Sequence, residues 1–200
     1  MVSQETLDYY DATADRDVRE DLVGAIELVA EKTTVIDCGC GAGRDIEFLR
    51  KAGFEVFAFD LEADAIERCQ RRFSGDDKVH LVQATFSSFD YPPANLIVAD
   101  ASLFYCPPEE FDQVWNKIVS ALVPGGVFVG SFLGPNDSMV TSANKGEIDW
   151  PVVSDFSEQA LRSKFDGFEI TKWTEHEVDG QKANGDDNHW HIFAVIAVKT

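Results

Sequence analysis

The stretch Val35 to Gly43 reads Val-Ile-Asp-Cys-Gly-Cys-Gly-Ala-Gly, and it decides which fold the chain is expected to adopt. A short β-branched run leads into glycine at every second position, and residues 44–52 then carry the apolar spacing of a helix. The pattern predicts a strand, a tight loop and a helix. Glycines without a Cβ allow a bulky ligand to lie directly on the main chain. Asp37 ends the strand, so we expect its carboxylate in the crevice where open α/β sheets bind ligands.

A dinucleotide-binding loop is the competing interpretation, and it requires a third glycine three residues after the second. Counted from Gly39 and Gly41, that position is Arg44. Counted from Gly41 and Gly43, it is Ile46. The missing glycine disfavours a nicotinamide-dependent oxidoreductase.

Composition limits the class of protein. With 200 residues and 44% hydrophobic content, we expect a single domain over 1–200 with a sizeable core. No run approaches the roughly 18 apolar residues of a spanning helix, which predicts a soluble, cytoplasmic protein without a membrane partner. Acidic residues outnumber basic ones 36 to 17, and the net charge of −19 repels nucleic-acid phosphates. We therefore expect no nucleic-acid partner.

The four cysteines predict neither disulfides nor a metal centre. They stand at 38, 40, 69 and 106, without the paired CxxC spacing of zinc sites. Reduced thiols are typical of the cytosol.

Further along the chain, apolar periodicity predicts alternating strands and helices up to a long polar loop at 135–153. Predicted helices cover 18–30, 44–52, 63–73, 109–122 and 157–165, and predicted strands cover 54–60, 79–83, 96–99, 127–133, 168–177 and 189–199. Asp60 ends the second strand at the distance from the glycine loop where a carboxylate takes ribose hydroxyls, and this role is favoured over that of a solvated turn acid.

The chain resembles class I S-adenosylmethionine-dependent methyltransferases in a series of features that follow one another along the sequence. These features are the acid and glycines of 37–43, Asp60, Asp100, the Leu-Val-Pro-Gly-Gly turn of 122–126 and the terminal hairpin. The small single-domain group similar to tellurite-resistance methyltransferases is the subgroup suggested. The resemblance implies an α/β fold: a seven-stranded Rossmann-like sheet, mostly parallel, with a reversed C-terminal hairpin strand and helices on both faces.

The same resemblance implies S-adenosylmethionine as the cofactor, with S-adenosylhomocysteine as the product. The implied cofactor-binding residues are Tyr9, Tyr10, Asp37, Gly39, Gly41, Gly43, Arg44, Asp60, Leu61, Ala84, Thr85, Phe86, Asp100, Ala101 and Ser102. Thr85 stands where the family often has an acid, and Phe86 is equally compatible with the core. Tyr9 and Tyr10 are either a lid over the sulfonium or aromatic anchors of the first helix.

Methyl transfer from a sulfonium needs orientation and exclusion of water more than acid or base. If the acceptor must lose a proton, the candidate bases are His176, His189, His191 and Asp100. Alternation along a strand places His189 and His191 on one face, where a substrate-contacting role is the preferred hypothesis and a metal site is not expected.

We expect a small, partly apolar methyl acceptor over the fourth and fifth strand ends, between a helical arm and lid at 1–31 and a substrate-side loop at 134–155. The alternative function is a scaffold or sensor that binds the cofactor without turnover. The sequence does not indicate an oligomeric state.

Overall fold

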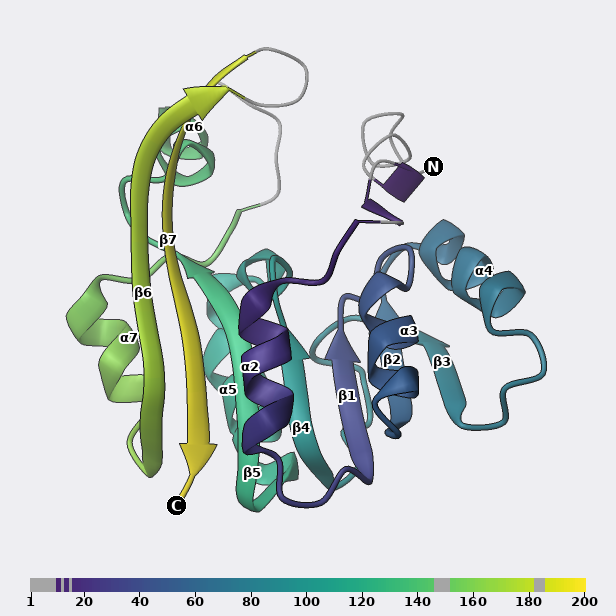
Figure 1. Cartoon of the computed structure of the whole chain (residues 1–200). Coiled ribbons are helices and arrows are strands. Elements are labelled where there is room, and N and C mark those ends of the chain that lie inside the picture. Colours follow the sequence, from purple (N-terminus) through teal and green to yellow (C-terminus); the bar gives the residue numbers. More distant parts are fainter. Residues whose placement is uncertain (1–9, 12, 15, 146–151, 182–185) are drawn as a thin grey trace.

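The computed structural model describes residues 10–11, 13–14, 16–145, 152–181 and 186–200, so the predicted site residue Tyr9 lies outside the described residues. A single seven-stranded sheet runs through the structure in the order β3-β2-β1-β4-β5-β7-β6 (Figure 1). All neighbouring strands up to β5 are parallel, and β7 is antiparallel to both β5 and β6. The predicted fold class is confirmed.

Most predicted elements are present, with ends shifted by a few residues. The strands are β1 (Thr34–Cys38), β2 (Glu55–Asp60), β3 (Val79–Gln83), β4 (Ala94–Ala99), β5 (Leu122–Leu133), β6 (Phe168–Gln181) and β7 (Asp187–Lys199). The helices are α2 (Glu20–Leu28), α3 (Arg44–Lys51), α4 (Ala63–Arg72), α5 (Pro108–Ala121), α6 (Ser138–Lys145) and α7 (Glu158–Lys164), with a 3-10 turn, η1 (Leu103–Tyr105).

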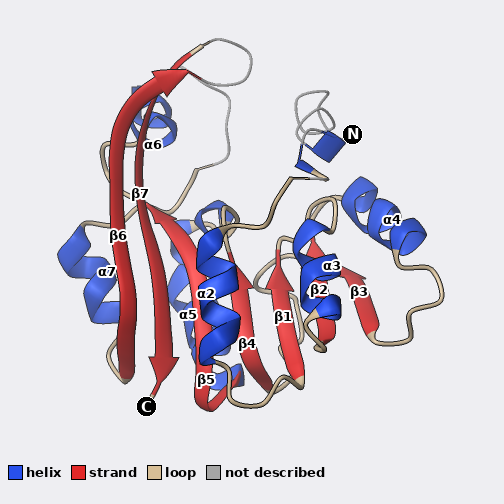
Figure 2. Ribbon diagram, in the orientation of Figure 1, coloured by secondary structure: helices blue, strands red, loops and turns tan. Residues whose placement is uncertain are grey.

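Helices cover both faces of the sheet (Figure 2). On one face α2, α3 and α4 bury one apolar cluster, and on the other α5 and α7 bury a second cluster rich in aromatic rings. Trp115 of α5 joins that second layer together, because its ring packs against Phe128 and its Nε1 donates to the carbonyl of Lys164, 2.9 Å away. The parallel strands are buried from both sides, as continuous apolar runs predict.

Strands β6 and β7 form a hairpin that extends beyond the carboxyl end of β5 (Figure 1). Their pairing continues to Gln181 and Asp187, whereas β5 pairs with β7 only as far as Leu133 and Ile192. The predicted strands were too short and the predicted loop between them was too long. Helix α6 lies within the predicted polar loop and contacts β7.

Direct pairing across strands fixes which side chains share a face of the hairpin. Ser131 pairs with Ala194, while Phe132 pairs with Phe193 on the opposite face. Since His191 is two residues from Phe193, its ring lies on the Phe132 face and away from Ser131.

Among the described residues, no helix combines the length and the apolar character that a bilayer crossing requires.

Candidate functional site

The loop that follows β1 is tied to the end of β2 through its main chain. The N–H groups of Gly39 and Cys40 both donate to the carbonyl of Phe59, at 2.9 and 3.0 Å. The N–H of Gly41 donates to Oδ2 of Asp60 at 2.9 Å. These bonds hold a bare loop between two strand ends, next to the point where the chain order of the sheet reverses, between β1 and β4.

Gly39 is required for the approach of the loop that follows β4. Its φ is +77°, and a Cβ at this position would lie 2.6 Å from Cβ of Ser102. Oγ of Ser102 donates to the carbonyl of Cys38 at 2.5 Å. The predicted site residues Gly39 and Ser102 are therefore brought together, from strands that the sequence separates widely.

Asp37 is buried beneath this loop, with 4% of its surface exposed. Its Oδ2 has no hydrogen-bond partner among the described residues. Burial raises the pKa of Asp37 well above its usual range, and the nearby carboxylates of Asp45 and Asp60 raise it further. Burying the ionised form of Asp37 costs free energy, and a cationic ligand group beside this carboxylate would offset part of that cost.

Asp60 accepts hydrogen bonds at both oxygens. Besides Gly41, the N–H of Glu62 donates to Oδ1 at 3.0 Å. Burial raises the pKa of Asp60, and the N–H groups of Glu62 and Gly41 oppose that rise. The carboxylate is thus fixed in orientation at the end of β2, with lone pairs left for a further donor.

Asp100, at the end of β4, forms an ion pair with a residue that the sequence did not suggest. Nε of Arg19 lies 2.7 Å from Oδ2 of Asp100. Burial raises the pKa of Asp100, and Arg19 and a hydrogen bond to Ser131 lower it. Ser131 was also missed, although a single serine within the apolar run of β5 is a readable signal. Its Oγ accepts from the N–H of Ala101, whose φ of 50° is unusual for a residue with a Cβ.

The predicted adenine-side residues divide into exposed and packed positions. Leu61, next to Asp60, is 61% exposed. A flat apolar ligand that covered this side chain would remove its apolar surface from water. Thr85 is exposed, and its hydroxyl is hydrogen-bonded to Ser88 at 2.9 Å. Ala84 and Phe86 pack against the aromatic core.

Tyr10 and Arg44 both lie beside the second half of the glycine loop. Tyr10 is buried against Ala42 and Ala65, and its ring edge lies 3.5 Å from where a Cβ of Gly41 would stand. Arg44 begins α3 and pairs with Asp45, its Nε 2.7 Å from Oδ1. Tyr10 packs as an anchor of the N-terminal segment, and its place beside the loop is also where a cofactor contact was predicted.

His189 and His191 lie on the hairpin face that turns away from Asp100 and Ser131. The main chain of both contacts the loop after β5, because Oγ of Ser138 accepts from the N–H of His189 and Oδ2 of Asp137 accepts from that of His191, at 2.8 and 2.9 Å. The predicted proximity to 137–138 thus involves the backbone of the strand, not the imidazoles.

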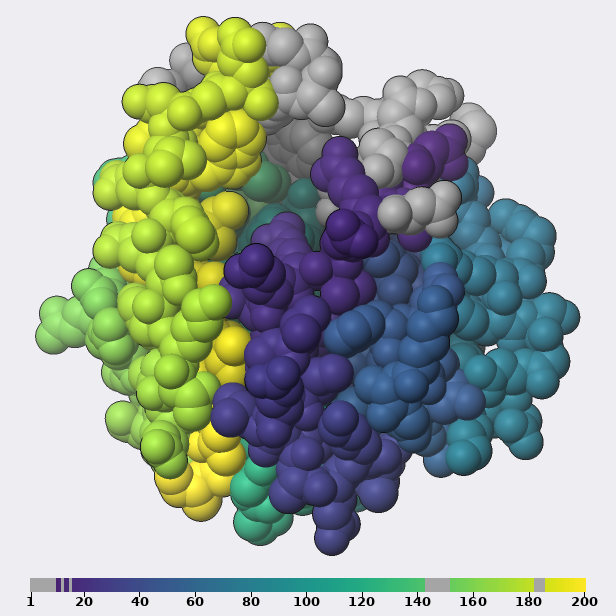
Figure 3. All heavy atoms as spheres, viewed as in Figure 1, coloured from purple at the N-terminus to yellow at the C-terminus, as the bar shows by residue number. Residues whose placement is uncertain are grey.

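Above the strand ends, the surface is hollowed between the β6–β7 hairpin and the N-terminal segment that leads into α2 (Figure 3). Phe104, Leu133, Val140 and Val153 form a small buried apolar cluster, against which Ile192 of the hairpin packs. Leu133 and Ile192 lie on the Ser131 face of β5 and β7, so this cluster is on the same side of the sheet as Ser131.

A family model described as a methyltransferase domain matches residues 35–126. The chain is 28% identical over 120 residues to a carboxy-S-adenosyl-L-methionine synthase of Photobacterium profundum, a match that covers 54% of this chain and 49% of that protein. The chain spans about half the length of the curated relatives it matches.

Among solved structures, TehB from Haemophilus influenzae is similar with a TM-score of 0.75 at 16% identity, covering 98% of this chain and 67% of that one. A 1,6-didemethyltoxoflavin-N1-methyltransferase of Burkholderia thailandensis, solved with 1,6-didemethyltoxoflavin and S-adenosylhomocysteine, is similar with a TM-score of 0.67 at 19% identity, covering 98% and 84%. At such low identities these structures show the fold alone.

Proposed function

We propose that this chain is a class I S-adenosylmethionine-dependent methyltransferase that transfers the methyl group of S-adenosylmethionine to a small molecule, and the match of residues 35–126 to a methyltransferase-domain model supports this. The observation that carries this proposal is the bare main chain of Gly39–Gly43, fixed between the carboxylates of Asp37 and Asp60. The family match supports the cofactor; the small acceptor is our inference.

The residues around the loop suit a cofactor with one cationic end and one ribose. Asp37 would neutralise an ammonium group, a role supported by its Oδ2, which is buried without a partner among the described residues. Asp60, already oriented by two N–H groups, would accept from ribose hydroxyls. Leu61 would cover an adenine face. Together these contacts use charge, hydrogen bonding and apolar area at three separate parts of one ligand.

When bound, the cofactor supplies an activated methyl group on a positively charged sulfur. The chain then needs to hold the acceptor in line with that bond and to exclude water. Asp100 is our proposed base where the acceptor carries a proton, because burial raises its pKa and it lies at the carboxyl end of β4, where the cofactor loop also lies. A catalytic role for His189 and His191 stays a prediction, and their rings lie on the other face.

The partly buried apolar side chains beside the Phe104 cluster, Ala101, Met139 and Ile192, suggest an acceptor with an apolar part. The B. thailandensis enzyme, a 1,6-didemethyltoxoflavin-N1-methyltransferase solved with 1,6-didemethyltoxoflavin bound, is consistent with a small acceptor. The P. profundum relative is named for making a carboxylated S-adenosylmethionine, which supports cofactor use rather than a particular acceptor.

Calorimetry with S-adenosylmethionine and S-adenosylhomocysteine tests the binding half of the proposal, and absence of binding to both rejects it. Incubating the protein with methyl-labelled cofactor and a small-molecule extract tests turnover. A labelled small molecule supports the enzyme, whereas tight binding with no labelled product supports the scaffold or sensor.

A further inference from the structure

The β6–β7 hairpin carries a row of alternating carboxylates and imidazoles that the proposed methyl transfer does not use. Glu175, Glu177 and Asp179 alternate along β6, and His189 and His191 alternate along β7. His191 pairs with Glu177 and His189 with Asp179. All five side chains therefore lie on the same face, which is the face that turns away from Ser131.

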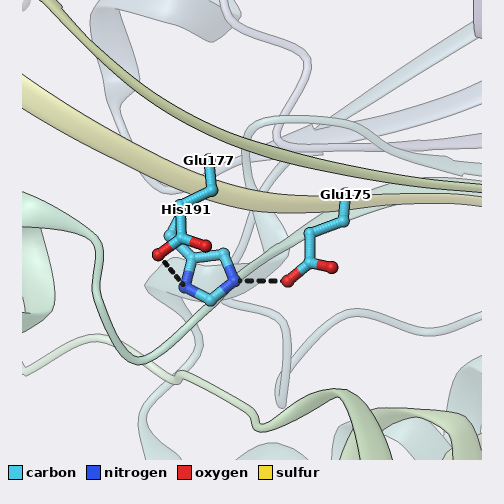
Figure 4. A group of neighbouring side chains, drawn as sticks. All are labelled: Glu175, Glu177 and His191. Carbon is cyan, nitrogen blue, oxygen red and sulfur yellow. Dashed lines mark hydrogen bonds and ion pairs between the residues drawn. The ribbon is translucent and has the colours of Figure 1, made fainter.

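Each imidazole has one ring nitrogen hydrogen-bonded to an outer carboxylate. Nε2 of His191 lies 3.0 Å from Oε1 of Glu175 (Figure 4). Nδ1 of His189 lies 2.7 Å from Oδ1 of Asp179. A histidine that binds a metal almost always donates its other ring N–H in this way, which fixes the tautomer and the ring orientation.

The second nitrogen of each imidazole faces the central carboxylate. Oε1 of Glu177 lies 3.6 Å from Nε2 of His189. The same oxygen lies 4.0 Å from Nδ1 of His191 (Figure 4). Both separations exceed a hydrogen bond. Two ligands of a tetrahedral zinc ion, each about 2.0–2.2 Å from the metal, stand roughly 3.4 Å apart. Oε1 of Glu177 thus needs to move only slightly toward either imidazole. The two imidazole nitrogens lie more than 4.8 Å apart, and a rotation of the more exposed His189 side chain must bring them to one ion.

We propose that Nε2 of His189, Nδ1 of His191 and Oε1 of Glu177 bind a divalent first-row transition-metal ion, with Glu175 and Asp179 as the carboxylates that orient the two imidazoles. Two imidazoles and one carboxylate suit zinc, nickel or ferrous iron and leave further coordination positions open. Ligand atoms of Glu177 and His191 already lie within 4.8 Å of each other and of Glu175, and His189 is the ligand that must move to complete the site. The site is separate from the proposed cofactor loop.

Asn136, in the loop after β5, makes the contacts that an ion would replace. Its backbone N–H donates to Nδ1 of His191 at 3.3 Å, and its side-chain amide nitrogen donates to Oε1 of Glu177 at 2.8 Å. Turning the side-chain amide of Asn136 by half a rotation would exchange its nitrogen and oxygen, so that the oxygen could be a fourth ligand. Metal binding should therefore shift this loop relative to the hairpin.

The surroundings leave a route for the ion and hold the most buried ligand in place. A cavity of about 540 Å³ is lined by Asp179 and His189. The ring of His191 packs directly on the main chain of Gly134, where a Cβ would overlap it. Only 6% of the His191 side chain is exposed, against 33% for His189. One ligand is thus rigid while the others remain accessible.

Titration of the full-length reduced protein with ZnCl₂ by calorimetry, and with CoCl₂ by visible absorption, tests the site. We expect one ion per chain, with Co²⁺ bands of a low-coordinate nitrogen and oxygen site. His189→Ala, His191→Ala and Glu177→Gln should abolish that binding, and Glu175→Gln should weaken it about 10- to 100-fold.

His176→Ala is the matched control, because His176 lies on the same strand but pairs with Ile192 on the opposite face. It should leave the Zn²⁺ affinity unchanged. Thermal unfolding with and without Zn²⁺ distinguishes loss of the metal site from loss of the fold. Zn²⁺ should raise the melting temperature of the wild type and of H176A, but not that of folded E177Q. No Zn²⁺ binding by the wild type, or equal binding by the H189A/H191A double variant, would overturn the proposal and leave S-adenosylmethionine binding unaffected.

Discussion

Replacing Asp37 by asparagine should stabilise the ligand-free protein and weaken its binding of S-adenosylmethionine. Asp37 is 4% exposed and its Oδ2 has no partner among the described residues. An unsatisfied buried acceptor costs about 1–3 kcal/mol, and more when it is charged. Because the amide of D37N would also lack partners, we expect a gain of about 1 kcal/mol in the free energy of unfolding, or roughly 2–4 °C in melting temperature.

The difference in stability between D37N and the wild type should depend on pH in a definite direction. The folded-state pKa of Asp37 is raised, so its ionisation costs stability as the pH rises from its unfolded pKa through its folded pKa. Below the unfolded pKa the wild type and D37N should be equally stable in this respect. The advantage of D37N should therefore grow toward neutral and alkaline pH.

Cofactor binding should change in the opposite direction. A hydrogen bond to a charged group contributes about 1.5–3 kcal/mol, which corresponds to a loss of about 10- to 100-fold in affinity when the ammonium faces an amide. Urea unfolding at several pH values and calorimetry with S-adenosylmethionine measure the two effects. Asp76→Asn is the control: Arg50 lowers the pKa of that distant carboxyl, so D76N should lose a little stability and keep its affinity. A less stable D37N at pH 8, or one with unchanged affinity, would refute the reasoning.

Three further changes test other contacts. Gly39→Ala should lose about 1–3 kcal/mol in urea unfolding, because a Cβ there would meet Ser102 and its φ is positive. Arg19→Met should destabilise more at pH 8 than at pH 4 in the same assay, since removal of its charge raises the pKa of Asp100 further and ionised Asp100 then stays buried without its partner. Trp115→Ala should cost about 3–5 kcal/mol of unfolding free energy, because its buried ring fills the aromatic layer.

The cofactor loop was predictable from sequence because its geometry is local. Glycines at alternate positions, an acid before them and an acid at the end of the next strand are all fixed by one strand–loop–helix–strand unit. The structure joins Gly41 to Asp60 by a single hydrogen bond of 2.9 Å. The partners of Asp100 were not predictable in this way, since Arg19 and Ser131 come from distant segments and nothing in their spacing points to β4.

Helix α6 was missed because its own sequence, Ser-Met-Val-Thr-Ser-Ala-Asn-Lys, has no strong apolar stripe. Its start depends on Asp137, which is 2% exposed and accepts the N–H of Met139 at 2.9 Å. The other oxygen of Asp137 accepts from the N–H of His191 on β7. Because the residue that caps α6 is also bound to β7, the helix depends on a contact outside its own segment, and the sequence of that segment alone does not predict it.

The length of the β6–β7 hairpin was underestimated for a related reason, and its two faces also bear on where an acceptor would bind. Its outer half is acidic and polar, which is typical of loops, yet cross-strand hydrogen-bonded pairs such as His189 with Asp179 stabilise strands. Those pairs occupy one face, with His189 and His191 among the carboxylates. The opposite face, with Ile192 packed against the Phe104 cluster, is the one that adjoins Asp100 and Ser131. Selectivity for the acceptor should therefore depend on this second face, whereas substitutions in the imidazole row should act through the position of the hairpin.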